Sequence, residues 1–357
     1  MKKSLLVTLE YPPQIGGVAH YYSNLVNNLP AEKILVLTNE KNKLLWRIPF
    51  LGWIKSFFTI KKFVKENDIE IIMVGQILPL GTVVWLLSKW LKIPYVVFIM
   101  AMEVTYVKQY RRKQWLMKKI LVEAKKIITI STYTKFEILK LISSRYQRKI
   151  EIIFPVPNIV PSKYPEAIKE CCKKHKPVLL TVGRLVQRKG HDMVIKALPE
   201  ILKEIPNLQY IIVGDGNYKN QLKKLVSKLN LDKQVIFTGE LSDQKTASYY
   251  AIADVFIMVP REMPNRDVEG FGIVYLEANS FEKPVIGGQS GGVTDAVVDG
   301  YTGFLVEPEN TSMICQAVVR LITNKDMAHK MGYQGKIRVD QEFNLKAKAQ
   351  QLQNILL

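Results

Sequence analysis

The chain has 357 residues, 48% apolar and 23% charged, which is too long for one typical domain and excludes an intrinsically disordered protein. Its three cysteines, with Cys171 and Cys172 adjacent, exclude a disulfide framework and a zinc module. The net charge of +19 is uneven: residues 1–157 hold 25 Lys and Arg against 10 Asp and Glu (+15), and residues 158–357 hold 26 against 22 (+4). The first half favours an anionic partner or surface; a lysine-rich protein without one is the alternative.

The chain begins with a basic tip and a short apolar run. We interpret residues 4–9 as a buried strand and not as a signal peptide, because Glu10 ends the run and no small-residue cleavage site follows. The 18 uncharged residues 71–88 have the length of a transmembrane candidate, but Gly and Pro interrupt them. A strand, a loop and a helix at about 82–91 fit better. We expect a cytoplasmic protein, with peripheral contact to the inner face of the plasma membrane left open.

Short runs of Val, Ile and Leu alternate with amphipathic stretches along the chain. Continuous apolar runs are typical of strands buried on both faces of a parallel sheet. The runs are 5–9, 33–38, 69–74, 95–100, 126–131, 150–155, 177–183, 209–214, 235–239, 255–259, 284–288 and 303–307. They predict two doubly wound α/β domains. The first is 1–160 with a C-terminal helix at about 343–357, the second is 161–342, and a proline-rich linker covers 154–165.

The segment TVGRLVQRKGHDMVIKAL (181–198) places two cations in a strand-to-helix loop, where open parallel sheets bind ligands. Arg184 and Lys189 follow the strand, and we expect a helix to begin near His191 or Asp192. Cations beside a helix N-terminus form an anion site, and the flanking glycines let the backbone approach a ligand. The segment favours a phosphate group; a solvated basic loop is the alternative.

The segment DVEGFGIVYLEA (267–278) places two acids around a glycine-rich helix start. We expect the helix to begin at about Ile273, with amides that favour a phosphate. Glu269 and Glu277, roughly 12 Å apart along a helix, could bind the hydroxyls of a sugar and of a ribose. A structural helix with Glu269 at its positive end is the alternative, but it leaves the buried acid Glu277 unexplained.

Together with YPPQIGGVAHYYSNL, VGDGNYKNQL, VIFTGEL and GGVTDAVVDGYTGFLVEP, these segments resemble a known family. They are similar to retaining, nucleotide-sugar-dependent glycosyltransferases of family 4 (glycosyltransferase group 1), above all to the group that includes phosphatidylinositol mannosyltransferases. The resemblance covers most of the chain. It implies the GT-B fold, in which two Rossmann-like domains face a central cleft, with the donor bound mainly in the second domain and the acceptor in the first.

The resemblance also implies roles for individual residues. Arg184 and Lys189 would hold the donor diphosphate, Glu269 would lie near the donor sugar, and Glu277 would bind the ribose. Further donor contacts would come from the loop before the helix, from the base pocket and from the first-strand loop of the N-terminal domain. These residues are Gly270, Phe271, Gly272 and Ile273; Leu241; and Gly16 and Gly17.

One segment departs from the family pattern. In IPYVVFIMAMEVTY (93–106), the family commonly has His-Gly where Met100 and Ala101 stand, whereas Glu103 occupies the place of the family's acid. The missing His leaves an inactive donor-binding subunit as an alternative function. His20 is a candidate substitute on the acceptor side; a structural role is its alternative.

The resemblance implies transfer with retention of anomeric configuration, in which the departing phosphate takes the acceptor proton. Arg184, Lys189 and the helix start would stabilise the charge on the leaving nucleoside diphosphate, so no metal or other cofactor is required. The likeness to mannosyltransferases favours GDP-mannose as the donor and cell-envelope polysaccharide or glycolipid synthesis as the role.

The acceptor side is the basic half of the chain. Lys108–Lys126 holds eight basic residues against Glu123, and residues 46–63 mix Trp and Phe with Lys. Basic and aromatic residues on amphipathic helices suit an anionic membrane, so we expect a lipid-linked acceptor. Helices that only pack an apolar face on a sheet are the alternative.

Two other functional classes are alternatives to a glycosyltransferase. A nucleotide-sugar epimerase of similar fold would turn over the donor alone, and it stays open. A nucleic-acid-binding protein would need a helix-turn-helix, zinc or RNA-sheet signature, which the sequence lacks. We therefore predict no nucleic-acid partner.

Overall fold

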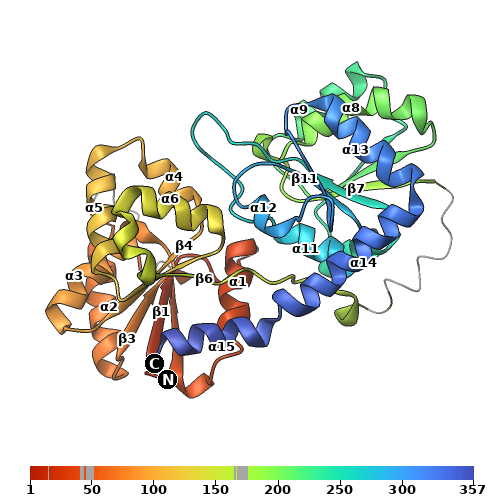
Figure 1. The fold of residues 1–357 in the computed structure, drawn as a ribbon. Coiled ribbons are helices and arrows are strands. Elements are labelled where there is room, and N and C mark those ends of the chain that lie inside the picture. Colours follow the sequence, from red (N-terminus) through yellow and green to blue (C-terminus); the bar gives the residue numbers. More distant parts are fainter. Residues whose placement is uncertain (15, 41–43, 46–51, 165, 167–175) are drawn as a thin grey trace. The chain divides into compact units, whose positions relative to one another are not determined.

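The strands of the computed structural model form two six-stranded parallel sheets, each in its own unit (Figure 1). The structure describes residues 1–14, 16–40, 44–45, 52–164, 166 and 176–357. Unit 1 consists of Met1–Pro155 and Asn344–Leu357, and unit 2 of Val156–Phe343. The predicted α/β class is confirmed, because all twelve predicted runs contain a strand. The first segment of unit 1 ends at Pro155, within the predicted linker 154–165 and before the predicted boundary at 160.

The sheet of unit 1 has the strand order β2-β1-β3-β4-β5-β6. Its strands are β1 (Ser4–Thr8), β2 (Ile34–Thr38), β3 (Ile71–Val74), β4 (Tyr95–Ile99), β5 (Lys126–Thr129) and β6 (Ile150–Ile152). Ser4 pairs with Ile34 on one side and with Ile71 on the other, so β1 lies inside the sheet next to its edge strand β2, and the order reverses between β1 and β3. Every residue of β1, β3 and β4 is buried, as continuous apolar runs predict.

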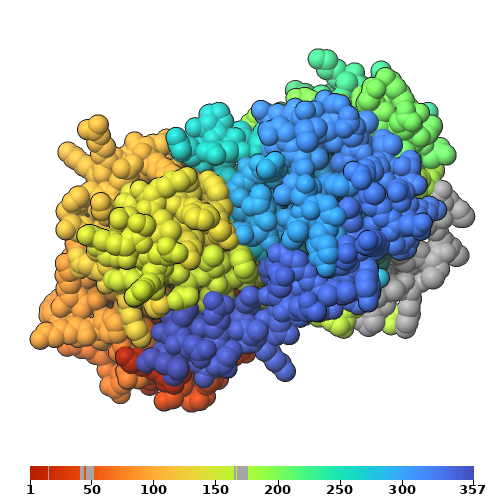
Figure 2. Space-filling model, viewed as in Figure 1, coloured from red at the N-terminus to blue at the C-terminus, as the bar shows by residue number. Residues whose placement is uncertain are grey.

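Helices cover both faces of this sheet. They are α1 (Gly17–Val26), α2 (Ile54–Glu66), α3 (Thr82–Leu91), α4 (Met102–Val107), α5 (Arg111–Glu123), α6 (Thr132–Ile142) and α15 (Leu345–Ile355). Helices α2, α3, α5 and α6 share one apolar core with Val97 and Ile99, whereas Phe98, which points to the other face, packs on α1. The C-terminal helix α15 packs on α1, and in Figure 2 it lies over the red N-terminal segment.

The sheet of unit 2 has the order β12-β11-β10-β7-β8-β9. Its strands are β7 (Val178–Val182), β8 (Gln209–Val213), β9 (Val235–Gly239), β10 (Val255–Met258), β11 (Val285–Gly288) and β12 (Gly303–Val306). Its helices are α8 (His191–Glu204), α9 (Lys219–Lys228), α10 (Asp243–Ile252), α11 (Ile273–Ser280), α12 (Val293–Ala296), α13 (Thr311–Thr323) and α14 (Lys325–Glu342). Helices α8, α9 and α13 share the core on one face of the sheet, and Phe256 packs on α10 and α11 on the other.

The stretch 71–88 has the predicted order of elements. It forms β3, a short helical turn at Ile77–Gly81 where we expected a loop, and then α3. Within the described parts of the chain, the structure contains no helix with the length and apolar character needed to cross a membrane.

Ala101 has a strained backbone directly after β4. Its φ of 92° and ψ of −60° lie in a region that side chains with a Cβ avoid, and the residue is only 1% exposed. Ala101 stands where the resembled family commonly has Gly. The turn therefore keeps a glycine-like conformation without the glycine, which supports the register of the sequence comparison at this point.

We predict that Ala101→Gly raises the free energy of unfolding of unit 1 by about 1 kcal/mol, because glycine adopts positive φ without a steric cost. Ala124 is a matched control, since it is fully buried but has a φ of −59°. Ala124→Gly should lower the same free energy by about 1 kcal/mol. Urea unfolding followed by tryptophan fluorescence reports on unit 1, which contains all five tryptophans. Equal destabilisation by both variants would contradict the strain.

Candidate functional site

The strand order of unit 2 reverses between β7 and β10, which are neighbours in the sheet. Ligands of open parallel sheets bind beyond the carboxyl ends of the strands at such a switch point. The loop after β7 carries Arg184 and Lys189, and the loop after β10 carries Glu269. The sheet order thus brings together two loops that are far apart in the sequence.

Lys189 and Glu269 form an ion pair at this switch point. The Nζ of Lys189 lies 2.6 Å from Oε2 of Glu269, and Nη1 of Arg188 lies 2.6 Å from the same oxygen. The three side chains are only 11–13% exposed. Burial by itself would raise the pKa of Glu269, but the two cations outweigh it and lower that pKa to about 2. Glu269 is therefore a carboxylate across the physiological pH range.

Arg188 is a site residue that sequence reasoning missed. Its guanidinium bridges Glu269 and Asp267, with Nε 3.1 Å from Oδ1 of Asp267. Adjacent basic residues in a loop carry no periodic signal that tells which of them turn inward. The run of basic residues was the only indication that the sequence offered.

Arg184 lies in the same loop with an exposed side chain. Within the described residues, its guanidinium makes no ion pair, so it is available to an anion. Its carbonyl oxygen lies 3.2 Å from Nε2 of His191, the first residue of α8. Burial lowers the pKa of His191 to about 4, so the neutral imidazole donates this hydrogen bond and ties the loop to the helix start.

A buried ion pair joins the two loops of the switch point. Arg261 and Asp192 form a bidentate pair at 3.1 and 3.0 Å, and both are less than a tenth exposed. The backbone N–H of Arg261 donates to the carbonyl of Arg188 at 2.9 Å. Gly190 has a φ of 75° and packs against Val259, and a Cβ on Gly190 would collide with the backbone of Val259. These contacts hold the basic loop against the loop that carries Glu269.

Helix α11 begins at Ile273, as predicted. Gly272 precedes it with φ of 92°, and a Cβ there would collide with the ring of Tyr275. Among the described residues, no side chain caps this helix start. Phe271 is buried, with its ring 5.9 Å from that of Phe343, and Gly270 is buried too. The loop can therefore offer a ligand its backbone amides but not the Phe271 side chain.

Glu277 is buried on α11 and has three hydrogen-bond donors inside the protein. The hydroxyl of Tyr250 donates to Oε2 at 2.9 Å, and the amides of Asn158 and Ile159 donate to Oε1 at 3.3 Å each. Burial raises its pKa despite these bonds. We expected a structural helix to leave Glu277 unexplained. This expectation was wrong, because the linker and α10 supply hydrogen-bond partners that the sequence did not reveal.

Leu241 follows β9 and precedes Ser242, whose side chain caps α10. Its side chain is half-buried, and it lies at the carboxyl end of an edge strand. This is the side of the sheet on which Glu269 and Lys189 lie. The structure therefore leaves Leu241 accessible from the ligand side of unit 2.

The remaining candidates belong to unit 1. Gly16 and Gly17 lie at the start of α1, and His20 is in its first turn. The Oε2 atom of Glu103 accepts the amide of Met100 at 2.9 Å. Burial raises the pKa of Glu103 to about 7. Among the described residues, His20 and Glu103 share no hydrogen bond or ion pair.

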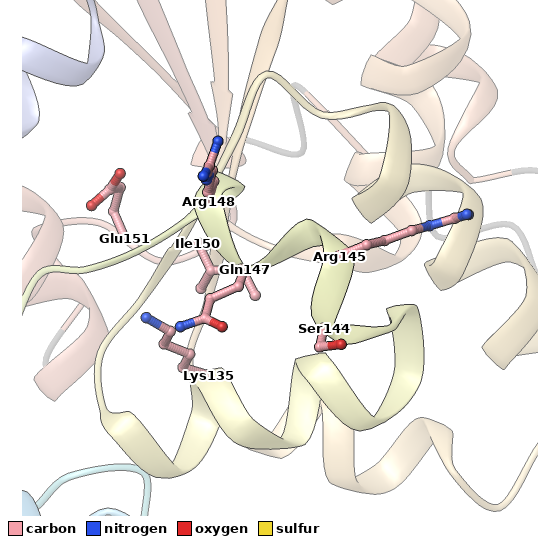
Figure 3. Close-up of a pocket in the computed structure, with 7 residues that line it drawn as sticks. All are labelled: Lys135, Ser144, Arg145, Gln147, Arg148, Ile150 and Glu151. Atoms are coloured by element: carbon pink, nitrogen blue, oxygen red, sulfur yellow. The ribbon is translucent and has the colours of Figure 1, made fainter.

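Two surface hollows help to place the site. One of about 760 Å³ lies in unit 1 beside the first residue of β6, and Figure 3 shows Arg145 directed away from the other labelled side chains. It lies at the amino end of the sheet, opposite to where ligands of parallel sheets bind. A second hollow of about 600 Å³ lies at the carboxyl ends of unit 2, between Gln187, Arg261 and Glu309. The second hollow is lined by Gln187 of the basic loop and by residues of the loop that carries Glu269, but neither Lys189 nor Glu269 lines it.

Unit 2 is a doubly wound α/β unit with two cations and a helix start at its switch point, and unit 1 is a second doubly wound α/β unit. A crystal structure of the Anabaena protein HepE in complex with UDP and glucose has the same fold, with a TM-score of 0.81 at 18% identity over 100% of this chain and 99% of that one. The fold is that of GT-B glycosyltransferases.

Residues 165–338 match the family described as glycosyl transferases group 1. A GDP-mannose-dependent alpha-(1-6)-phosphatidylinositol monomannoside mannosyltransferase of Mycolicibacterium smegmatis is 40% identical over 162 residues, 45% of this chain and 42% of that one. A GDP-mannose-dependent monoacylated alpha-(1-6)-phosphatidylinositol monomannoside mannosyltransferase of Corynebacterium glutamicum is 28% identical over 99% of this chain and 98% of that one. The matched segment is a group 1 glycosyl transferase domain, and the chain is a nucleotide-sugar-dependent glycosyltransferase.

The ion pairs of Glu269 predict a specific pH dependence of stability. Its pKa is about 2 in the folded protein and near the ordinary 4.5 when unfolded, so its stabilising contribution is present above about 4.5 and is lost as the pH falls toward 2. Glu269→Gln leaves the buried Lys189 without a carboxylate and Arg188 with Asp267 alone, and it should cost roughly 3–5 kcal/mol at neutral pH. We expect the difference in Tm between wild type and Glu269→Gln to shrink as the pH falls.

Thermal unfolding at a series of pH values checks this prediction. Glu262→Gln is the control, because Glu262 is an exposed acid in the same loop. A Tm difference for Glu269→Gln that stays constant from neutral to acidic pH would show that the ion pairs do not stabilise the fold.

Proposed function

We propose that this glycosyltransferase moves mannose from GDP-mannose to a lipid-linked or glycan acceptor, with retention of anomeric configuration. The observation that carries the proposal is the Lys189–Glu269 pair at the switch point of unit 2, beside the uncapped start of α11. The names of the relatives, which are GDP-mannose-dependent mannosyltransferases acting on phosphatidylinositol mannosides, support the donor and the acceptor class.

In this proposal the donor lies along the carboxyl edge of unit 2. Arg184 and Lys189 hold the diphosphate with the amides at the start of α11, and Glu269 lies near the sugar. Leu241 lines the base pocket. Glu277 binds the ribose, for which it would exchange its hydrogen bonds with the linker amides. The further proposed contacts are Gly270, Phe271 through its backbone, Gly272 and Ile273, and in unit 1 Gly16 and Gly17.

The chemistry proposed for this site follows from its charges. As the bond between the sugar and the diphosphate breaks, negative charge builds on the phosphate oxygen, and Lys189, Arg184 and the helix dipole stabilise it. The acceptor hydroxyl forms the new bond on the same face of the sugar and gives its proton to the departing phosphate. No metal is required in this scheme. On the acceptor side, we assign Glu103 and His20 to contacts with the acceptor.

We predict that GDP-mannose raises the Tm of the protein more than other nucleotide sugars do, because only the folded state binds it. Lys189→Ala and Arg184→Ala should each lower kcat/KM by about 10²–10³, the scale for loss of one preorganised charge. Lys223→Ala, which removes an exposed cation elsewhere in unit 2, is the control. The product anomer, read by NMR, tests retention.

Other outcomes of the same measurements would contradict parts of the proposal. Near-normal turnover of both Lys189→Ala and Arg184→Ala would remove their proposed role. Conversion of the donor to its epimer without an acceptor would favour the epimerase. Donor binding with no transfer to any acceptor would favour an inactive donor-binding subunit.

The acceptor class also rests on the surface of α5. Trp115 is 60% exposed, and Arg111, Arg112, Lys118 and Lys119 lie three or four residues before or after it, on the same side of the helix. The Nζ of Lys119 lies 5.9 Å from the centre of the Trp115 ring. Within the described residues, none of these four cations forms an ion pair. An exposed indole among unpaired cations suits the interface of an anionic membrane.

The opposite side of α5 agrees with the alternative, in which this helix only packs an apolar face on the sheet. Met117, Ile120 and Leu121 are fully buried against the sheet, so an apolar face does pack inward as that alternative expects. Lys108 and Lys126, at the two ends of the basic stretch, form ion pairs with acids of unit 1. Within the basic stretch 108–126, the membrane proposal therefore rests on the outward face of α5.

The second predicted stretch, residues 46–63, gives partial support to the membrane proposal. Its first part, 46–51, lies outside the described residues. In the remainder, Trp53 and Phe58 are 37% and 62% exposed, whereas Ile60 is buried against the sheet. The ring of Trp90 on α3 stacks on Phe57 at 5.5 Å and is itself 58% exposed. Aromatic side chains thus remain at the surface of α2 and α3.

We predict that the protein sediments with phosphatidylglycerol vesicles at low salt and is released at high salt, because the attraction is electrostatic. Lys118→Glu/Lys119→Glu should abolish most of the binding. The control is Lys223→Glu/Lys224→Glu, the same charge change on exposed neighbouring lysines of α9. Absence of binding at low salt, or an equal loss in both variants, would defeat the proposed membrane face.

A further inference from the structure

Two cations share one oxygen of Glu269, but their other partners differ. Arg188 also pairs with Asp267, at 3.1 Å, so it has a second acid to hold it. Within the described residues, Lys189 pairs with Glu269 only. Lys189 can therefore leave the carboxylate without breaking any other ion pair, whereas Arg188 is fixed on two sides.

The charges of this cluster are balanced before any ligand binds. Arg188 and Lys189 carry two positive charges, and Asp267 and Glu269 carry two negative ones. The positive charge of Lys189 is thus already neutralised, and a diphosphate must compete with Glu269 for it. Once Lys189 turns to the diphosphate, Glu269 would be left as a buried carboxylate, which is costly without a partner.

We propose that Arg188 is a positioning residue that keeps Glu269 ionised and in place while Lys189 exchanges from Glu269 to the donor diphosphate. This inference rests on the proposed function of the site. Arg188 acts through Glu269 and not on the donor, because its guanidinium lies between Asp267 and Glu269.

The backbone supports this role. The carbonyl of Arg188 accepts the amide of Arg261, whose side chain is locked to Asp192 in the first turn of α8. Arg188 is thereby fixed at its backbone as well as at its guanidinium. Such double support holds a side chain in one position while its neighbour moves.

Kinetics of three variants test the exchange. In Arg188→Met, Lys189 is the remaining ion-pair partner of Glu269, so it should leave the carboxylate less readily. The donor KM should therefore rise and kcat should fall, which lowers kcat/KM by about 10²-fold. Arg188→Lys keeps the charge but cannot bridge both acids, and it should recover part of kcat. Arg266→Met is the control, because Arg266 is an exposed arginine of the same loop.

A titration of the free protein gives a readout that a merely structural role would not move. The charged and titratable groups facing Glu269 are Arg188, Lys189 and the hydroxyl of Tyr275. The carboxyl carbon signal of Glu269 in ¹³C-labelled protein is assigned by its loss in Glu269→Gln. The titration midpoint of the Glu269 carboxyl should rise by about one unit or more in Arg188→Met, which removes the arginine charge. If Arg188→Met does not fold, the midpoint should rise in Arg188→Lys.

The outcomes separate this inference from the function on which it rests. A wild type that binds no nucleotide sugar would overturn the proposed function and the exchange with it. An active wild type whose Arg188 variants change neither the Glu269 midpoint nor kcat would overturn the role of Arg188 alone. A raised midpoint together with a raised donor KM and a lowered kcat would establish it.

Discussion

One carboxylate oxygen organises the candidate site. Glu269 holds Lys189 and Arg188 at 2.6 Å each, and the three side chains come from loops that meet only because β7 and β10 are neighbours in the sheet. Without the carboxylate, two cations would lie next to each other in a largely buried position, which is strongly unfavourable. The ion pairs with Glu269 thus hold both cations at the switch point of unit 2.

The same region is connected to both places where the chain crosses between the units. Glu277 on α11 accepts the amides of Asn158 and Ile159, just after the first crossing. Phe271, in the loop before α11, packs on Phe343, the last residue before the second crossing. Glu277 and Phe271 thus each contact a residue next to one of the two crossings.

The sequence predicted what depends on local pattern. Continuous apolar runs located all twelve strands, and glycines beside polar loops located the starts of α8 and α11. It did not predict what depends on tertiary contacts. Arg188 and Lys189 both turn inward because acids on another loop attract them, and the partners of Glu277 lie on α10 and in the linker. A one-dimensional pattern contains the residues but not these distances.

The departure at Met100 changes one side chain but not the turn around it. Ala101 keeps the positive φ that a glycine would adopt, and the amide of Met100 is bound by Glu103 at 2.9 Å. A strained alanine persists only where its surroundings demand that backbone path. The path after β4 leads directly to Glu103, and burial raises the pKa of this carboxyl to about 7. Among the acceptor contacts that we propose, Glu103 therefore offers a carboxyl group where the resembled family also has an imidazole.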